Sequence, residues 1–498
     1  MTDAETGRKR ILLVNPPLHF SRGVPRTLEV SAPHLGLLYL AGYAKQHSDA
    51  FDFHYMDVGP EQLNLRDIKA RVEALRPFAI GISSNTPQLQ GTLELARFLR
   101  AETRIEAPVF LGGPHVSADE GFIHRHPGLF DHAITGEAEK TFLDSLHRLL
   151  NGNPPPRLQP GQPIANLDEI PFPDRSLVKM HRYSRRQTCL LSRGCPYKCY
   201  FCASFFVGDK LTKTRYRSAT NMLGELKQIA AYGGGEITFS DDTFTLKKRL
   251  VLDLCTLIRE AGLAIRWSCN ARVDTLDDEM IAAMRGAGCE WVFMGVEAAS
   301  ERLRKMIIKK GRFSNDDIRR RIDACHRHGV RVGGYFILGH PGETVAEMHQ
   351  TRDMMLGYGF DGISLGALLP FPGTEMYEMA KRAGVIDDRT LDRWANKEMG
   401  EGYGGAFPVF IPEGVDRDEV FSQMRTINRK FYLNFKTFWY RLRRDLTSWN
   451  DLKLDVKQFI SILTRGGSSI RPFASYSAAP HPAEDASSPR RMQLASHE

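Results

Sequence analysis

The sequence has few cysteines, no long apolar run near its start and no strong excess of one charge sign. Its 498 residues contain only 8 cysteines, too few for the disulfide scaffold of a secreted domain. The longest nearly apolar run near the start, residues 35–44, is half of the roughly 20 residues that a membrane-spanning helix needs. The N-terminal segment has too short an apolar core for a secretory signal. We therefore expect a cytoplasmic protein with free thiols.

The composition excludes a disordered chain and gives little support for nucleic-acid binding. Hydrophobic residues make up 42% and charged residues 25% of the sequence, close to the average of soluble globular proteins. Lys and Arg exceed Asp and Glu by 8, and the two signs are mixed along the chain. This balance permits an anionic cofactor or a membrane surface without demanding nucleic acid. The length predicts about two to four domains.

Short apolar runs alternate with helical patterns over the first 150 residues. The strand-like runs are residues 11–15, 51–58, 79–84, 108–113 and 132–137. This alternation is typical of an α/β domain with a doubly wound parallel sheet, of the Rossmann or flavodoxin-like kind. Ligands of such sheets bind at the carboxyl ends of the strands. Several of these ends are rich in glycine, which would let a bulky flat ligand approach the backbone.

A second alternating block follows a break rich in proline and glycine at residues 151–163. Its six strand-like runs are residues 188–192, 236–239, 265–269, 291–296, 330–338 and 362–369. Six units are short of the eight that close a full barrel, so we expect a partial (β/α)6 barrel with an open side. The predicted divisions are a first domain over 8–150, a linker over 151–183, the barrel over 184–400, C-terminal helices over 401–465 and a disordered tail over 466–498.

Three of the eight cysteines, Cys195, Cys199 and Cys202, are gathered in the segment SRGCPYKCYFCAS. Three thiolates on one loop can ligate three irons of a [4Fe–4S] cluster and leave the fourth iron open for a chelating ligand. A structural zinc site usually has four protein ligands, and no further Cys or His stands at the usual spacing. The other five cysteines are scattered, and we expect them to be ordinary buried residues.

This motif, with Phe201 before the last cysteine, resembles the radical S-adenosylmethionine (SAM) superfamily. The resemblance implies that the three cysteines hold the cluster and are required for catalysis. It also implies that the open iron binds the amino and carboxylate groups of SAM. One electron, from a donor of the flavodoxin or ferredoxin type, would then cleave SAM and give a 5′-deoxyadenosyl radical.

Two aspartates are the first candidates for SAM contacts in the predicted barrel. Superfamily members often carry a Gly-Gly-Glu motif after the second strand, and residues 234–236 spell these letters. They precede the run 237–239, however, and would lie at the wrong end of the barrel. We therefore prefer Asp241 and Asp242, which follow that run. The alternative for both is a solvated turn or a helix cap.

Glu297 and Arg272 are further candidates at strand ends. In similar proteins, the glutamate of a Gly-Val-Glu sequence such as residues 295–297 lies beside SAM. Arg272 would pair with a carboxylate or substrate group, or form a surface salt bridge. The loops 339–343 and 370–374 are rich in Gly and Pro, and would lie over the active site or serve only as turns.

The first domain resembles the cobalamin-binding subclass of the same superfamily in the segments PHLGLLYLAGY, GGPHVS and TGEAE. Many cobalamin domains carry Asp-x-His-x-x-Gly, whose histidine ligates cobalt. Here Gly59 stands in the place of that histidine, so this motif supplies no lower ligand. The expected cofactor contacts are Ser83, Ser84, Gly112, Gly113 and His115, the last as a polar contact. The alternative is a domain of this fold without the cofactor.

The resemblance implies a cobalamin-dependent radical SAM enzyme, and we favour a class B methyltransferase. It would transfer a methyl group from methylcobalamin to an unactivated carbon or phosphorus of a natural-product, lipid or tetrapyrrole substrate. The alternative is a radical oxidative cyclase, since proteins similar to the anaerobic magnesium-protoporphyrin monomethyl ester cyclase share this domain order. A non-enzymatic iron–sulfur carrier would leave the barrel motifs without a role.

The basic and aromatic segment 430–440 has two interpretations. It would contact an anionic membrane surface, which would suit a lipid or tetrapyrrole substrate. Alternatively, its aromatic residues form the packed face of a helix that caps the barrel.

Overall fold

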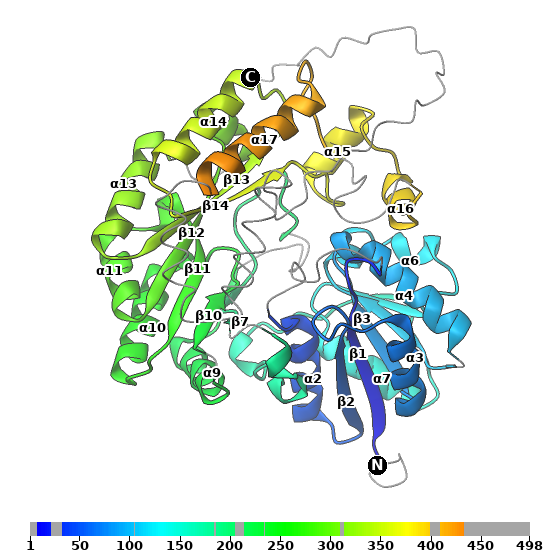
Figure 1. Ribbon diagram of the computed structural model, residues 1–498. Coiled ribbons are helices and arrows are strands. Elements are labelled where there is room, and N and C mark those ends of the chain that lie inside the picture. The colour runs from blue at the N-terminus through cyan, green and yellow to red at the C-terminus, as the bar shows by residue number, and fades with distance from the viewer. Residues whose placement is uncertain are drawn as a thin grey trace, which may run out of the picture.

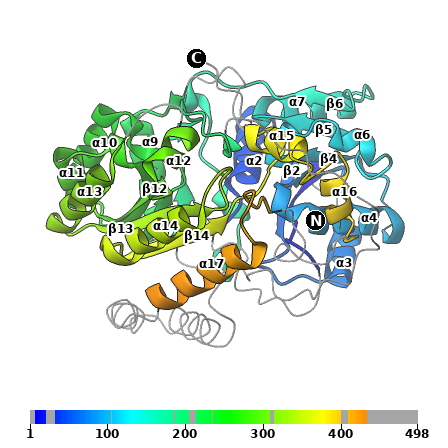
Figure 2. The same ribbon diagram turned by 90° about the horizontal axis from the view of Figure 1, so that it is seen from above.

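The computed structural model describes residues 7–20, 32–103, 105–183, 186–204, 214–233, 235–308, 313–398 and 409–432. These residues form two parallel sheets of six strands each. The sheets lie side by side, each with its own helices (Figures 1 and 2). We call the part built on the first sheet the N-terminal lobe and the part built on the second the barrel lobe.

The sheet of the N-terminal lobe has the strand order β2-β1-β3-β4-β5-β6, with all pairs parallel. Its strands are β1 (Lys9–Asn15), β2 (Phe51–Asp57), β3 (Ala79–Ser83), β4 (Val109–Gly112), β5 (His132–Thr135) and β6 (Leu158–Pro160). Its helices are α2 (Leu35–His47), α3 (Leu65–Leu75), α4 (Leu89–Glu102), α5 (Pro114–Ala118), α6 (Phe122–Arg125) and α7 (Glu139–Leu150).

Helices cover both faces of this sheet, which confirms the predicted doubly wound fold. Alternate residues of β1 separate the two faces. Leu13 packs with the buried side chains of α2 and α7 on one face, and Val14 packs with those of α3 and α4 on the other. Because both faces are buried, the strands are continuously apolar, as in the fully buried β3. The break expected to be a linker contributes strand β6, which pairs with β5 at the edge of the sheet.

The barrel sheet has the order β14-β13-β12-β11-β10-β7, again with all pairs parallel. Its strands are β7 (Arg186–Cys189), β10 (Glu236–Phe239), β11 (Arg266–Arg272), β12 (Cys289–Glu297), β13 (Arg331–Leu338) and β14 (Gly362–Ala367). Within the described residues β7 and β14 do not pair with each other, so the partial six-stranded barrel is confirmed. A short hairpin of β8 (Ser192–Arg193) and β9 (Arg215–Tyr216) follows β7.

Helices surround the barrel sheet on its outer side (Figure 2). They are α9 (Ala219–Ala231), α10 (Lys248–Glu260), α11 (Asp278–Gly286), α12 (Glu301–Ile307), α13 (Asn315–Arg327) and α14 (Val345–Gly357). After β14 come α15 (Glu375–Arg382), α16 (Thr390–Ala395) and α17 (Arg417–Tyr432). Short 3-10 helices lie at Thr86–Gln88, Leu167–Glu169, Arg175–Leu177, Met180–Arg182, Phe244–Leu246 and Val273–Thr275.

Segments far apart in the sequence join the two lobes. Helix α16 packs against α4 (Figure 1), where the fully buried Trp394 joins the core of the N-terminal lobe. Its carbonyl accepts a hydrogen bond from the Gln90 side chain at 2.9 Å. In the segment that follows β6, Arg175 forms an ion pair with Glu225 of α9 at 2.6 Å, and Arg217 contacts the same carboxylate. All three of these charged side chains are buried.

Helix α17 lies beside α14 and β14 (Figure 1). Phe431 is buried, and the Tyr432 hydroxyl donates a hydrogen bond to the Ile363 carbonyl of β14. The start of the segment 430–440 therefore packs against the barrel, whereas residues 433–440 and the predicted tail 466–498 lie outside the described residues. In the described part of the chain, every helix is too short or too polar to cross a membrane.

Candidate active site

The three clustered cysteines lie in the loop that follows β8, and all are half-buried. Burial raises the pKa of each thiol, that of Cys199 to about 12, and the neighbouring Cys202 and Cys195 raise the Cys199 pKa further. These three thiols are thus close enough to oppose one another's ionisation. Bound irons would supply the positive charge that holds them as thiolates.

Three thiols on one loop are the donor set that an iron–sulfur cluster takes from a protein. Among the described residues, no three His, Cys, Asp or Glu side chains converge as ligands of one metal ion. An iron–sulfur cluster does not need that convergence, since each cysteine binds a different iron.

Aromatic residues between the cysteines anchor the loop to the barrel. Arg272, at the end of β11, stacks on the Tyr197 ring with its guanidinium carbon 3.7 Å from the ring centroid. Asp274 holds that guanidinium with two hydrogen bonds of 2.9 and 2.8 Å. The Tyr200 hydroxyl is 2.6 Å from Nδ1 of the buried His340, which follows β13. Arg272 therefore positions the loop, and its charge is already shared with Asp274.

The two predicted aspartates face different surroundings. Asp241 is buried and accepts hydrogen bonds from the backbone N–H groups of Leu191 and Ser192 and from the Ser192 hydroxyl. It thereby ties the end of β10 to the chain leading into the cysteine loop. Asp242 is exposed to a cavity and accepts a 2.8 Å hydrogen bond from the Ser204 hydroxyl. Desolvation in this concave setting raises the Asp242 pKa.

Glu297 ends β12 with an unusual backbone conformation. Its φ of 69° lies in the left-handed region, which is costly for a residue other than glycine, and the pairing with β13 shifts register there. Desolvation raises the Glu297 pKa to about 8, and the positive charge of Arg272 opposes this rise only in part. Strained backbone and a strongly raised pKa at a strand end are features of functional sites.

Glu236, the last residue of the Gly-Gly-Glu sequence, lies at the opposite end of the barrel from Asp242. Glu236 is the first residue of β10 and pairs with the exposed Arg266 at 2.7 Å. Glu236 therefore lies at the start of the strand, and Asp241 and Asp242 follow its end, in the order that the sequence predicts.

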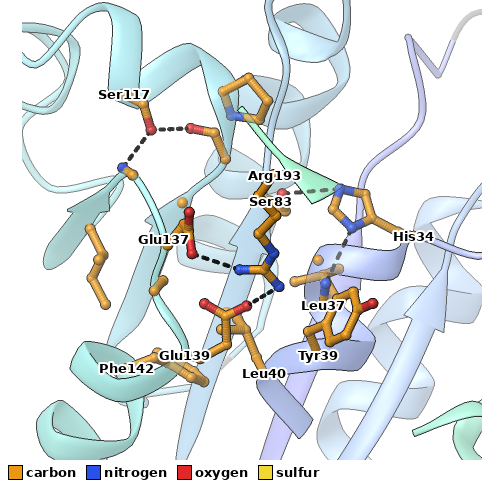
Figure 3. Close-up of a pocket in the computed structure, with 18 of the residues that line it drawn as sticks. His34, Leu37, Tyr39, Leu40, Ser83, Ser117, Glu137, Glu139, Phe142 and Arg193 are labelled. Atoms are coloured by element: carbon orange, nitrogen blue, oxygen red, sulfur yellow. Dashed lines mark hydrogen bonds and ion pairs between the residues drawn. The ribbon is translucent and has the colours of Figure 1, made fainter. Parts of the chain in front are cut away.

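A cavity of about 380 Å³ opens between the strand ends of the N-terminal lobe and the start of the cysteine loop (Figure 3). The N-terminal lobe supplies mostly apolar side chains and glycines from α2, β3, β4, β5 and α7. The barrel lobe supplies Leu190, Ser192, Arg193, Gly194, Ser204, Ser240 and Asp242. One cavity therefore touches both lobes.

The predicted cobalamin contacts fall into two groups. Ser83, Gly112 and Gly113 line the cavity. Gly113 has a φ of 100°, and a Cβ there would come within 2.7 Å of the Ser84 backbone nitrogen, so this close approach requires glycine. Ser84 and His115 are not among the lining residues. The Ser84 hydroxyl instead forms a hydrogen bond of 2.7 Å with the Thr92 hydroxyl of α4.

His115 is buried behind the cavity rather than in its wall. Its Nδ1 lies 3.1 Å from the Thr86 hydroxyl, and its ring packs edge-on against Phe122 at 4.8 Å between centroids. Burial lowers the His115 pKa to about 4, so the ring is neutral.

Sequence reasoning missed His34, the histidine that does line the cavity. Its Nδ1 accepts a hydrogen bond from the Leu37 backbone at the start of α2, and its Nε2 lies 3.1 Å from the Ser83 hydroxyl. Burial lowers the His34 pKa to about 4. The neutral ring with Nδ1 as acceptor carries its proton on Nε2, so His34 donates to Ser83. His34 caps the start of α2, and recognising this role in the sequence would have pointed to it as a site residue.

Glu137, Glu139 and Arg193 also line the cavity and were not predicted as site residues. The two glutamates belong to the TGEAE segment, whereas nothing local in the sequence distinguishes Arg193 except its place two residues before Cys195.

Two family models match this chain. The radical SAM superfamily model matches residues 189–355, and the B12 binding domain model matches residues 22–145. An uncharacterized methyltransferase of Pyrococcus horikoshii is 31% identical over 392 residues, which cover 74% of this chain and 83% of the relative. The chain belongs to the radical SAM superfamily. Its cofactors are a [4Fe–4S] cluster, SAM and cobalamin, as its two domains imply.

Other relatives differ in the reactions their names record. The anaerobic magnesium-protoporphyrin IX monomethyl ester cyclase of Rubrivivax gelatinosus is 23% identical over 88% of this chain and 80% of its own length. The cytidylyl-2-hydroxyethylphosphonate methyltransferase of Streptomyces wedmorensis is 26% identical over 86% of this chain and 91% of its own. The radical SAM methyltransferase TsrM of Kitasatospora setae shares the fold, with a TM-score of 0.65 at 18% identity over 84% of this chain and 91% of its own.

Proposed function

We propose that this radical SAM enzyme is a class B methyltransferase acting on a small molecule, with an electron donor of the flavodoxin or ferredoxin type. One observation supports this most directly: the strand ends of the cobalamin domain and Asp242 beside the cysteine loop line a single cavity. A methyl group passing between cofactors in the two lobes requires such a shared space.

The barrel lobe would bind the cluster and SAM, and the N-terminal lobe would bind cobalamin. Cys195, Cys199 and Cys202 would hold the cluster, and Asp242 and Glu297 would bind the cationic part of SAM. The apolar wall around Phe142, with Ser83, Gly112 and Gly113, would hold the uncharged parts of cobalamin. When bound, the cluster with SAM supplies the 5′-deoxyadenosyl radical and cobalamin supplies the methyl group.

Several relatives support methyl transfer by their names, including the phosphonate methyltransferase and a bacteriochlorophyllide d C-12(1)-methyltransferase of Chlorobaculum tepidum that is 25% identical over 76% of this chain. These substrates differ widely, so the class of acceptor stays open to experiment. The cyclase relative makes oxidative ring closure the competing outcome.

The test uses the full chain, purified without oxygen and supplied with iron, sulfide and hydroxocobalamin. It is incubated with SAM carrying a deuterated methyl group and a strong reductant, and the products are analysed by mass spectrometry. We expect 5′-deoxyadenosine, S-adenosylhomocysteine and deuterated methylcobalamin. Deoxyadenosine with cobalamin that is never methylated would favour the cyclase. Failure to bind cobalamin would contradict the proposed function.

A further inference from the structure

The TGEAE segment contacts the barrel lobe directly. Glu137 and Glu139 lie at the end of β5 and the start of α7. Opposite them, Arg193 of β8 and Arg215 of β9 reach across from the barrel lobe. We call these four residues the interdomain clamp.

The contacts of the clamp are specific and shielded from water. Arg193 places Nη1 2.8 Å from a Glu137 oxygen and Nη2 2.7 Å from a Glu139 oxygen, and Arg215 contacts the second oxygen of Glu137. The guanidinium carbon of Arg193 also lies 4.9 Å from the centroid of the Tyr39 ring. Figure 3 shows Arg193 between the two carboxylates. The Glu137 and Glu139 side chains are only 6% and 7% exposed.

The two arginines of the clamp lie on the strands that flank the cysteine loop in the sequence. Arg193 and Arg215 are register partners in the antiparallel β8–β9 pair. The three cysteines lie between these two strands in the sequence, with Cys195 two residues after Arg193. The clamp therefore fastens both ends of the cysteine-bearing segment to the cobalamin domain.

The same residues form part of the cavity wall. Glu137, Glu139 and Arg193 line the cavity beside Gly112 and Gly113. Because two glutamates meet two arginines, the clamp is balanced in charge and its carboxylates are already occupied. It is therefore poorly suited to bind a cofactor, but well suited to hold two surfaces in one orientation.

We propose that Glu137, Glu139, Arg193 and Arg215 are positioning residues that fix the cysteine loop relative to the cobalamin pocket. Reaction between two bound groups depends steeply on their separation and orientation. The role of the TGEAE segment is then to set the geometry between the cofactors. This inference rests on the two cofactors and is independent of whether the reaction is methylation or cyclisation.

The test measures the distance between the two cofactors in the full chain loaded with iron, sulfide and hydroxocobalamin. One-electron reduction of each cofactor, with a strong reductant for the cluster, gives a paramagnetic [4Fe–4S]+ cluster and paramagnetic cob(II)alamin, and pulsed electron paramagnetic resonance reports their dipolar coupling. We expect one narrow distance distribution in the parent protein. Glu139→Gln and Arg193→Gln should broaden or lengthen it, with iron and cobalamin content per chain unchanged.

Two further variants separate positioning from folding. Arg193→Gln combined with Glu139→Gln removes one charge of each sign and leaves the Arg215–Glu137 pair, so thermal stability should recover while the broad distribution stays. Glu236→Gln, in an ion pair at the far end of the barrel, is the matched control and should keep the narrow distribution. An unchanged distribution in the single variants, or a narrow one in the double variant, would overturn the proposal. Absence of cobalamin from the parent protein would overturn both this proposal and the proposed function.

Discussion

Glu61, Glu137 and Glu139 of the N-terminal lobe are buried, and each forms an ion pair with a cationic side chain. Asp242 and Glu297 at the barrel mouth form no ion pair with any described residue. In the N-terminal lobe Glu61 pairs with Arg71 and Lys179 at 2.7 and 2.9 Å, and Glu137 and Glu139 pair with Arg193. Among the described residues, the Asp242 side chain accepts a hydrogen bond from Ser204, and Glu297 lies near Arg272 without forming an ion pair with it. Desolvation raises the pKa of both.

The difference matches the charges of the two expected ligands. A carboxylate without an ion-pair partner is energetically unfavourable in a desolvated site. Such groups often mark functional sites, where a cationic ligand supplies the partner. SAM carries an ammonium and a sulfonium, and both would be stabilised by Glu297 and Asp242. The cobalamin side uses its charges between the lobes and presents a largely apolar wall. Substitutions at paired carboxylates should thus reduce stability, and those at unpaired ones should reduce ligand binding.

Cys199→Ala should have the largest effect, and this effect should be confined to the cofactor of the barrel lobe. Loss of one cluster ligand should remove the brown chromophore and all SAM cleavage, while cobalamin binding in the other lobe persists. Iron analysis, 5′-deoxyadenosine assays and cobalamin spectra measure the three outcomes. The buried Cys325, on α13, supplies the control Cys325→Ala, which should keep its iron. Retained SAM cleavage in Cys199→Ala would refute the cluster assignment.

Glu225→Gln tests a paired carboxylate at the junction of the lobes. It leaves the buried Arg175 and Arg217 without their shared partner. Breaking a buried ion pair on one side costs about 3–5 kcal/mol, so chemical denaturation of the apoprotein should occur at clearly lower denaturant. The exposed pair of Glu236 and Arg266 is the comparison, and Glu236→Gln should cost less than about 1 kcal/mol. Equal losses in both variants would contradict the distinction by burial.

Short continuous apolar runs separated by helical patterns were sufficient to predict both sheets, because parallel strands buried on two faces leave such runs in the sequence. They did not predict β6, since three residues ending in Pro160 give almost no pattern. Such a strand is tolerated because proline costs least at a sheet edge. The cysteine motif was equally visible, since its chemistry resides in closely spaced residues.

Side-chain direction was the part that the sequence did not determine. The strand-end rule selected Ser83 and Ser84 together, yet only Ser83 lines the cavity, since the next side chain turns toward α4. The same alternation separates Asp241 from Asp242. Arg193 had no local signal at all, because its partners lie more than fifty residues away in another lobe.

Glu297→Gln tests the unpaired carboxylate that is most strongly perturbed. Losing a charge-assisted contact of about 1.5–3 kcal/mol would weaken SAM binding roughly tenfold to a hundredfold. The parent affinity should also rise with pH up to about 8, where Glu297 becomes ionised, by at most about tenfold per pH unit. The variant should lack this rise. Equilibrium dialysis with SAM across this range is the measurement, and a pH profile shared by both proteins would exclude Glu297.

The sign of the stability effect provides an independent check on Glu297. Its folded-state pKa of about 8 lies above the ordinary value of 4.5, so the neutral form favours folding. This contribution is fully present below pH 4.5 and is lost as pH rises through about 8. Glu297→Gln carries no such titration. The variant should therefore become more stable relative to the parent as pH rises, the opposite of the result at Glu225.

Asp242→Asn should have the smallest effect and tests which strand end binds SAM. Because Asp242 is exposed to the cavity, solvent screens its charge, and removing that charge should weaken SAM binding by no more than about fivefold. Asp241→Asn is the matched neighbour and should lower stability instead, since its carboxylate accepts three hydrogen bonds from residues 191 and 192. Glu236→Gln should leave SAM binding unchanged. If it weakened binding more than Asp242→Asn, SAM would lie at the opposite end of the barrel, and the contrast between paired and unpaired carboxylates would lose its functional meaning.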